Sequence, residues 1–280
     1  MKRKIHVFDN DVRVFDDQLI AGQKERYLTR NVHESDEEDI FVELIRAIPA
    51  DGCFVNIGSA IGYYALLAKK LAPHLTVHAV EPLGRHRDFF VENMTLNGLN
   101  PTDFTVHEEA VYSGGGNQRF VDKGYGSSLY KVWRSGADKT STKGAVKTVI
   151  KVILTGSGLK KFETTPESDK VITIQTITLD QLLAKVGRSV DLLQMDVQGA
   201  EADILKGSLS SLRSGNITSF LIGTHGRVLH QECREILREH GYEIEHEEPN
   251  PTGQPDGIIV ATKGARRLKV RSEPSDSLRA

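Results

Sequence analysis

The sequence has little of what marks a disulfide-rich, metal-thiolate or membrane-spanning protein. Its two cysteines, Cys53 and Cys233, lie far apart and form no C-x-x-C pair, so we expect two reduced, buried thiols. Nowhere do about eighteen apolar residues follow one another, which excludes the usual pattern of a transmembrane helix. The N-terminal Met-Lys-Arg-Lys leads into polar residues, without the apolar run of a secretory signal. We therefore expect a soluble, cytoplasmic protein.

An excess of charge of one sign is also lacking. Lys and Arg number 36 against 38 Asp and Glu, for a net charge of -2. A protein that holds nucleic acid by neutralising phosphates needs a positive field, which this balance does not supply. Nucleic acid is therefore not expected as the main partner. The oligomeric state is left open, and a homodimer is compatible with the sequence.

The chain is organised around the stretch from Cys53 to Ala65. An apolar, β-favouring run up to Ile57 leads directly into Gly58-Ser-Ala-Ile-Gly62, and a helical apolar pattern follows to Leu71. This pattern predicts a strand, a tight turn and a helix. Glycine is needed where the backbone takes positive φ or must lie close to a ligand. The free N–H groups at the start of such a helix favour a polar ligand, for which a nucleotide-like cofactor is the natural candidate.

The spacing of the glycines separates one cofactor class from another. The dinucleotide fingerprint G-x-G-x-x-G has a second glycine that touches a pyrophosphate, and this chain has Ala60 in that place. The next predicted strand, residues 76–80, ends in Glu81, whose carboxylate can accept hydrogen bonds from both ribose hydroxyls. Together these features favour an adenosine without phosphates. The alternative is that a doubly wound domain carries such a glycine and acid without this ligand.

An N-terminal extension, residues 1–50, precedes the main domain. Alternating residues between 4 and 20 predict a β-hairpin, and Ser35 with Glu38 resembles the capping box of a helix that ends near Ile48. The loop between them holds Tyr27, His33 and Glu34. These three residues either help to close the cofactor pocket or pack as part of an N-terminal cover.

The main domain is predicted to span residues 51–262, with an insertion at about 113–170 and a disordered tail at 263–280. After a helix at 85–97, a third strand at 104–107 ends near Glu109, which could meet an adenine amino group. The insertion is too long for a simple connection and is interpreted as a lid that carries hairpin strands. Its candidate substrate contacts are Tyr125, Ser127, Ser128 and Trp133; the alternative is a disordered surface insertion.

The alternation of strands and helices resumes with strands at 171–176, 190–195 and 217–222. The second of these ends at Asp196 and the third leads to His225. Ligands of open α/β sheets bind beyond the carboxyl ends of the strands, so the glycine turn, Glu81, Asp196 and His225 should converge on one crevice. Asp196 either holds a cationic group of a ligand or caps the helix that follows it.

These residues resemble the FkbM-type S-adenosylmethionine-dependent methyltransferases. The motifs that carry the resemblance are Phe54-Val-Asn-Ile-Gly-Ser-Ala-Ile-Gly-Tyr-Tyr64, Ala79-Val-Glu-Pro82, Asn93-x-x-x-Asn97-Gly98, Thr178-Leu-Asp180 and the run from Asp191 to Gly207. The resemblance covers about residues 53–261 and is weakest in the insertion. The chain departs from the family where Asn56 replaces a usual Asp, where Gln198 replaces a usual Glu, and where the strand before His225 lacks a common acid.

The resemblance implies an α/β, Rossmann-like, doubly wound and mostly parallel sheet of the class I methyltransferase type. It also implies methyl transfer from S-adenosyl-L-methionine, usually to a hydroxyl oxygen of a small-molecule acceptor, sugar or natural product. The expected cofactor-binding residues are Asn56, Gly58, Ser59, Ala60, Gly62, Glu81, Pro82, Glu109, Ala110 and Asp196. Two other functions stay open: a nicotinamide-dependent oxidoreductase, which Ala60 disfavours, and a non-catalytic module that binds cofactor and a partner.

Catalysis of methyl transfer to oxygen requires alignment of two reactants and removal of a proton. His225 is the expected base because histidine titrates near neutrality, and Asp196 is expected to orient the acceptor. The two side chains could instead share a metal that lowers the pKa of the hydroxyl. A single histidine argues against magnesium, which prefers oxygen ligands, so the metal-free interpretation is favoured.

Overall fold

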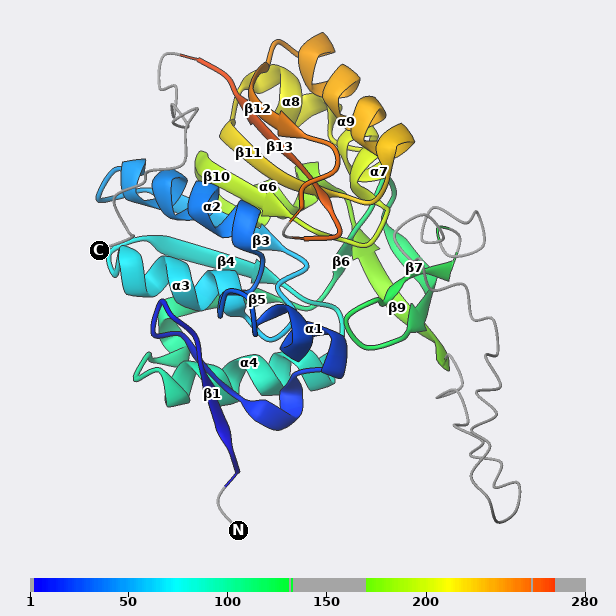
Figure 1. The fold of residues 1–280 in the computed structure, drawn as a ribbon. Helices are drawn as coiled ribbons and strands as arrows, with labels where there is room; N and C mark the ends of the chain where they lie inside the picture. The colour runs from blue at the N-terminus through cyan, green and yellow to red at the C-terminus, as the bar shows by residue number, and fades with distance from the viewer. Residues whose placement is uncertain (1–2, 131, 133–169, 253, 265–280) are drawn as a thin grey trace.

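The computed structural model describes residues 3–130, 132, 170–252 and 254–264 (Figure 1). Its main sheet has seven strands in the order β12-β13-β11-β10-β3-β4-β5. Five neighbours, from β11 to β5, run parallel, while β13 is antiparallel to both β11 and β12. In chain order the strands are β3 (Cys53–Ile57), β4 (Thr76–Val80), β5 (Phe104–His107), β10 (Val190–Met195), β11 (Ile217–Thr224), β12 (Glu243–Glu248) and β13 (Gly257–Thr262).

Helices cover both faces of this sheet, and each face has its own apolar core. Every residue of β3 is buried, and alternate side chains point to opposite faces, so Phe54 joins one core while Val55 joins the other. One core packs against α2 (Ser35–Ala47), α3 (Tyr63–Leu71) and α4 (Gly84–Leu96), and the other against α6 (Leu179–Val186), α7 (Glu201–Lys206), α8 (Leu209–Ser214) and α9 (Arg227–Glu239). The predicted Rossmann-like, doubly wound fold is confirmed.

The N-terminal extension forms the expected hairpin and packs on the α2–α3–α4 side. It contains β1 (Ile5–Val7), β2 (Arg13–Phe15), a 3-10 turn η1 (Asp16–Gln18) and the short helix α1 (Ala21–Arg26), which the sequence pattern did not indicate. The capping-box prediction for Ser35 is wrong, because Glu34 is the N-cap residue and makes no side-chain cap. Glu38 instead accepts hydrogen bonds from Asn10 and Tyr63, which tie α2 to the hairpin and to α3.

A second, four-stranded sheet lies beside the first, drawn in green in Figure 1. Its order is β6-β9-β7-β8, from β6 (Ala110–Val111), β7 (Gly116–Asp122), β8 (Ser128–Leu129) and β9 (Lys170–Ile177). The strand expected at 171–176 therefore pairs in this smaller sheet rather than in the main one, because β7 offers it an antiparallel partner along its full length. A 3-10 turn η2 (Pro101–Asp103) precedes β5. Trp133, the rest of the insertion from 134 to 169 and residues 265–280 of the expected tail lie outside the described residues.

None of the helices in the described part of the chain combines the length and the apolar character needed to cross a membrane.

Candidate functional site

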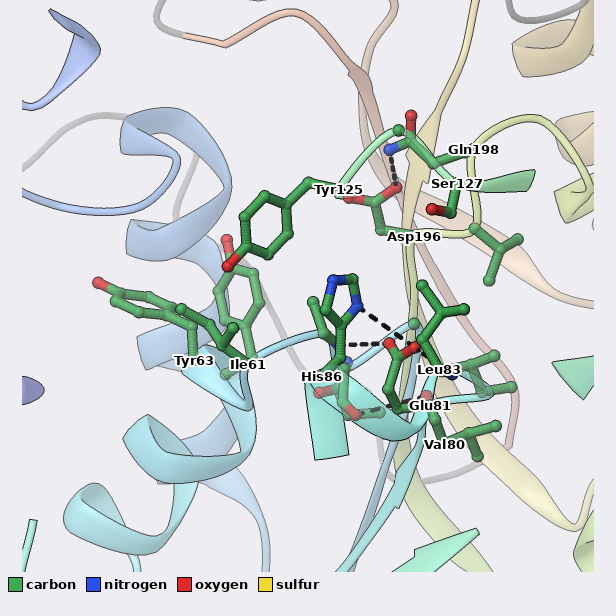
Figure 2. A pocket seen from close by; sticks show the side chains of 18 of the residues that line it. Ile61, Tyr63, Val80, Glu81, Leu83, His86, Tyr125, Ser127, Asp196 and Gln198 are labelled. Atoms are coloured by element: carbon green, nitrogen blue, oxygen red, sulfur yellow. Dashed lines mark hydrogen bonds and ion pairs between the residues drawn. The ribbon is translucent and has the colours of Figure 1, made fainter. Parts of the chain in front are cut away.

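A cavity of about 440 Å³ lies at the carboxyl ends of β3, β4 and β10. Its volume falls within the range of small-molecule sites, roughly 300–1,000 Å³. The wall includes residues from the glycine turn, from the end of β4, from the turn after β10, from α1 and from the segment between β7 and β8. Figure 2 shows Glu81 and Asp196 among the side chains that line it. The predicted crevice beyond the strand ends is therefore present as a cavity.

The glycines of the first turn are explained by the protein's own packing. Gly58 has φ +84°, and a Cβ there would lie 2.0 Å from the backbone oxygen of Asp196. Gly62 has φ +86°, and its Cβ would lie 1.9 Å from the ring of Phe90 on α4. Only glycine adopts this backbone region readily and leaves these neighbours in place. The sequence predicted that the backbone of these glycines lies close to a ligand; in the structure it lies close to the turn after β10 and to α4.

Glu81 is held against the cavity wall by backbone amides. Its Oε2 accepts from the N–H of Ala60 at 2.9 Å, and its Oε1 accepts from the N–H of Leu83 at 2.9 Å. The Nδ1 atom of His86 lies 3.4 Å from the same Oε1. The residue is 5% exposed and lines the cavity. These contacts fix the orientation of the carboxylate and leave lone pairs for a ligand.

His86 and Tyr125 form a second part of the wall. Their rings stack with centroids 5.2 Å apart and planes 11° apart (Figure 2). The hydroxyl of Tyr125 donates to the backbone oxygen of Gln18 in the N-terminal extension. No local sequence pattern indicates this role for His86. The described part of the insertion and the extension therefore meet over the cavity.

A chain of amides and one carboxyl group lies behind the cavity. Asn56 Nδ2 donates to Gln194 Oε1 at 2.7 Å, and Gln194 Nε2 donates to Glu37 Oε1 at 2.7 Å. Burial, followed by the charge of Asp196, raises the pKa of Glu37 to about 8. Asn56 lines the cavity, and its Oδ1 is buried without a hydrogen-bond partner. A buried acceptor of this kind is costly unless a donor reaches it, so it indicates a ligand with an N–H or O–H group.

His225 lies beneath the cavity and contacts three carboxylates. Its Nδ1 lies 3.0 Å from Glu201 Oε1, and its Nε2 lies 3.2 Å from Asp256 Oδ1 and 3.6 Å from Asp196 Oδ1. Burial alone would lower the pKa of the imidazole, but Glu201, then Asp196 and Asp256, raise it well above its usual value. The three carboxylates therefore favour the protonated, positively charged form of the ring. A charged imidazolium cannot accept a proton, so the arrangement disfavours the predicted role as a base.

Three carboxylates face one another at this end of the cavity. Glu34, Asp196 and Asp256 all line the wall, and each can offer one oxygen within 4.8 Å of the others. Burial raises the pKa of each of the three carboxyl groups, and for Asp256 it reaches about 7 although His225 lowers it. Like charges so close together favour protonation unless a cation is present. This end of the cavity is therefore suited to a cation or to proton transfer.

Comparison with known proteins decides the family. The model of the methyltransferase FkbM domain matches residues 53–244. The chain belongs to the FkbM methyltransferase domain family. A putative methyltransferase of Jannaschia sp. (strain CCS1) is 34% identical over 95 residues, which is 31% of this chain and 33% of that protein. The match thus spans about a third of the curated relative's length.

Two solved structures show similarity at the level of the backbone. A methyltransferase FkbM from Methylobacillus flagellatus KT has a TM-score of 0.49 and 11% identity, over 76% of this chain and 44% of that one. A precorrin-6y C5,15-methyltransferase from Geobacter metallireducens GS-15 has a TM-score of 0.46 and 13% identity, over 89% and 96% of the two chains. The resemblance to the FkbM family that the motifs indicated is confirmed by the family model.

The FkbM domain brings most of the residues expected from the sequence to one cavity. Those that line it are Asn56, Gly58, Ser59, Ala60, Glu81, Pro82, Ala110, Asp196, His33, Glu34, Tyr125 and Ser127. Gly62, His225, Tyr27 and Ser128 are buried close to the same elements but are not part of the wall. Glu109 is elsewhere, because its carboxylate pairs with Lys185 on α6.

Asp196 does not cap the helix that follows it. The N–H groups of Val197 and Gly199 donate to the carboxylate of Glu201, at 3.2 and 3.1 Å, so that residue satisfies the turn instead. Asp196 accepts from the side chain of Gln198 at 3.3 Å and keeps its place in the cavity wall. Asp256, Glu37 and Gln194 were missed. Asp256 lies in a Pro- and Gly-rich loop where no local pattern distinguishes a buried acid from an exposed one.

Proposed function

We propose that this FkbM-family domain transfers a methyl group from S-adenosyl-L-methionine to a hydroxyl oxygen of a small molecule, sugar or natural product. The observation that carries the proposal is the pairing, in one cavity, of an amide-fixed Glu81 with a group of buried carboxylates around Asp196. The first suits a ribose and the second suits a cationic or proton-releasing centre. The cavity volume of about 440 Å³ is compatible with a small acceptor.

The residues present fit the cofactor. Glu81 keeps lone pairs for the two ribose hydroxyls, in the charge-assisted geometry that makes strong hydrogen bonds. The unpartnered Oδ1 of Asn56 would accept from the ammonium group of the methionine part. Leu83, Ala110 and Val111 give the wall an apolar portion for an adenine ring. When bound, the sulfonium supplies an activated methyl group for in-line displacement.

The residues of the chain then hold the acceptor and receive its proton. Asp196 and Asp256 line the cavity, and their carboxyl groups have raised pKa values, so one of them can take a proton from a hydroxyl near neutral pH. We assign His225 to positioning, because its ring sits behind these two side chains and contacts both.

The pyrophosphate of a nicotinamide cofactor fits less well. The N–H of Ala60, which such a group would approach, is already bonded to Glu81. Ala60 itself has φ +46° and carries a methyl group where the dinucleotide fingerprint needs glycine. The wall therefore supports an adenosine with a methionine tail over a dinucleotide.

Isothermal titration with S-adenosylhomocysteine tests the cofactor, and transfer of labelled methyl groups to a panel of hydroxyl-bearing acceptors tests the reaction. We expect one binding site per chain and turnover of at least one acceptor. An absence of heat or thermal shift at millimolar ligand would contradict the proposal. Protection by NAD(H) alone would favour an oxidoreductase, and binding without turnover across the panel would favour a non-catalytic module.

A further inference from the structure

The carboxylate end of the cavity lacks a balancing positive charge. Glu34, Asp196 and Asp256 line it, and the carboxyl group of Glu37 lies directly behind. His225 contributes one positive charge from below, and it is already shared with Glu201, whose oxygen faces the Nδ1 atom. Arg26 is the other nearby cation in the wall, and its charge lowers the pKa values of Glu34 and Asp256 without offsetting the effect of burial. The acidic side chains therefore outnumber the basic ones.

Glu34 is a separate indication of a missing ligand. The residue is 6% exposed, and within the described residues its carboxylate makes no hydrogen bond and no ion pair. It points into the cavity wall, where one of its oxygens lies within 4.8 Å of oxygens from Asp196 and Asp256. Among the described residues, Glu37 Oε2 and Asp256 Oδ1 are also buried without a hydrogen bond, although Nε2 of His225 lies 3.2 Å from the second of these oxygens. A buried carboxylate without a partner carries a large desolvation cost, which either a proton or a bound cation can relieve.

We infer that Glu34, Asp196 and Asp256 bind one divalent, oxygen-preferring cation such as Mg²⁺ or Mn²⁺. Bonds of about 2.0–2.1 Å to such an ion place adjacent ligands of an octahedron about 2.9 Å apart and opposite ones about 4.2 Å apart. The three oxygens lie within 4.8 Å of one another, so the side chains would have to draw together around the ion. Three carboxylates leave the remaining positions of an octahedron to water or to a substrate oxygen. The site opens into the cavity because all three residues line it.

This arrangement changes the argument that disfavoured magnesium from the sequence. That argument counted His225 as a ligand and so left a softer transition metal open, whereas the ring lies behind the carboxylates. Its two nitrogens face oxygens of Glu201 on one side and of Asp196 and Asp256 on the other. The imidazolium therefore orients two of the ligands from outside the ligand set, as outer partners commonly do in metal sites. The set that faces the cavity consists of oxygens, which is the preference of a hard cation.

The role of the ion in the reaction depends on the proposed function, whereas its binding does not. An acceptor hydroxyl that occupies an open position would have its pKa lowered by the positive charge. Its proton would then leave to a carboxylate oxygen that the ion does not use, and the resulting alkoxide would take the methyl group. The ion would also fix the hydroxyl in line with the methyl donor.

Titration with Mn²⁺ alone, followed by electron paramagnetic resonance and calorimetry, tests the site on the full chain. We expect one ion per chain, with a Kd on the order of 10⁻⁵–10⁻³ M and competition by Mg²⁺. Glu34→Gln and Asp256→Asn should each weaken binding tenfold or more. Glu108→Gln should leave it unchanged, because that carboxylate is exposed and pairs with Arg87 outside the cavity. Mn²⁺ should also raise the melting temperature of the wild type and of Glu108→Gln by several degrees.

Each outcome separates this inference from the proposed function. No Mn²⁺ binding up to millimolar concentration, or binding that survives both cluster variants, would overturn the metal site. If S-adenosylhomocysteine still binds in that case, the methyltransferase proposal stands alone. If Mn²⁺ binds at the cluster but S-adenosylhomocysteine does not, the metal site stands and the proposed function fails. Melting curves of Glu34→Gln and Asp256→Asn without metal establish that both variants are folded, which we expect because each removes repulsion.

Discussion

The ring of His225 and the carboxylate of Glu201 are joined across 3.0 Å, and neither residue is more than 2% exposed. Burial would raise the pKa of Glu201, but the charge and hydrogen bond of His225 lower it. The same carboxylate accepts the N–H groups of Val197 and Gly199. The pair thus links the end of β11 to the turn after β10, and it fixes the backbone that carries Asp196.

His225→Ala should destabilise the fold strongly. The substitution leaves Glu201 buried without its counter-charge. It also removes the positive charge beside Asp196 and Asp256, so these two carboxylates repel each other more strongly. Loss of one partner of a buried pair costs about 3–5 kcal/mol, which urea unfolding would measure. His74→Ala, at an exposed position before β4, is the matched control and should be neutral. If His225→Ala unfolded at the same urea concentration as the wild type, the charge of the ring would not contribute to stability.

Glu81→Ala should weaken S-adenosylhomocysteine binding by on the order of tenfold to several hundredfold. Charge-assisted bonds to two ribose hydroxyls are worth roughly 1.5–3 kcal/mol each before desolvation is subtracted. Glu81→Ala also leaves the N–H groups of Ala60 and Leu83 without their acceptor. Glu81→Gln is therefore the second variant, because its amide oxygen can still accept a hydrogen bond from one of these groups. Calorimetry on both proteins measures the effect. Affinity within twofold of wild type in both would mean that Glu81 only braces the turn.

The sequence predicted the part of the site that depends on local pattern and on parallel strands. The run from Cys53 to Leu71 indicated a strand, a turn and a helix, and all three form. Because parallel strands end at one edge of the sheet, Glu81, Asp196 and His225 could be expected to converge, and they lie around one cavity. Asp196 and His225 contact each other, as the neighbouring positions of β10 and β11 required.

The rest depends on contacts that no local pattern records. Glu37 lies in the first turn of α2, where an acid is typical of any exposed helix, and its burial arises from packing against Gln194 on β10. Asp256 reaches the cavity because the antiparallel strand β13 inserts between β11 and β12. β9 continues the alternation of strand and helix along the chain, yet it pairs with β7 because that partner is close in space.

Gly62→Ala should destabilise the protein through two separate effects. An alanine at φ +86° costs about 1 kcal/mol, and its Cβ would overlap the ring of Phe90, which adds about 1–3 kcal/mol. Gly98→Ala isolates the first effect, because Gly98 has φ +70° and nothing lies within 4 Å of its Cβ position. Urea unfolding should therefore give a lower free energy of unfolding for Gly62→Ala than for Gly98→Ala.

The clash with Phe90 can be checked by a double-mutant cycle. Phe90→Leu makes room where the alanine methyl group would stand, so Gly62→Ala with Phe90→Leu should cost less than the sum of the single variants. A coupling energy of about 1 kcal/mol or more would support the contact. The contact would be contradicted if the destabilisation by Gly62→Ala and Phe90→Leu were strictly additive, or if Gly62→Ala and Gly98→Ala lowered the free energy of unfolding equally. Either result would mean that α3 and α4 can move apart without a loss of stability.

The buried pair of His78 and His107 should make stability depend on pH. Their ring nitrogens Nδ1 and Nε2 lie 3.1 Å apart on neighbouring strands. Burial, then the neighbouring His107, lowers the pKa of His78 to about 4, and burial lowers the pKa of His107 as well. The unfolded chain keeps the ordinary value near 6.5, so it binds more protons than the folded protein below that pH. The contribution of the pair is present above pH 6.5 and is lost as the pH falls toward 4.

Comparison with the double variant His78→Gln, His107→Gln isolates this contribution. Each histidine with a lowered pKa costs the folded state at most about 1.4 kcal/mol for every pH unit below 6.5. Carboxyl groups with raised pKa values, such as Glu37 and Asp256, act in the opposite direction, but both proteins contain them and their effect cancels in the difference. Between pH 7 and pH 5 the free energy of unfolding should therefore fall more in the wild type, by about 1–2 kcal/mol. Parallel urea-stability curves for the two proteins would mean that the pair is hydrated and titrates normally in the folded state.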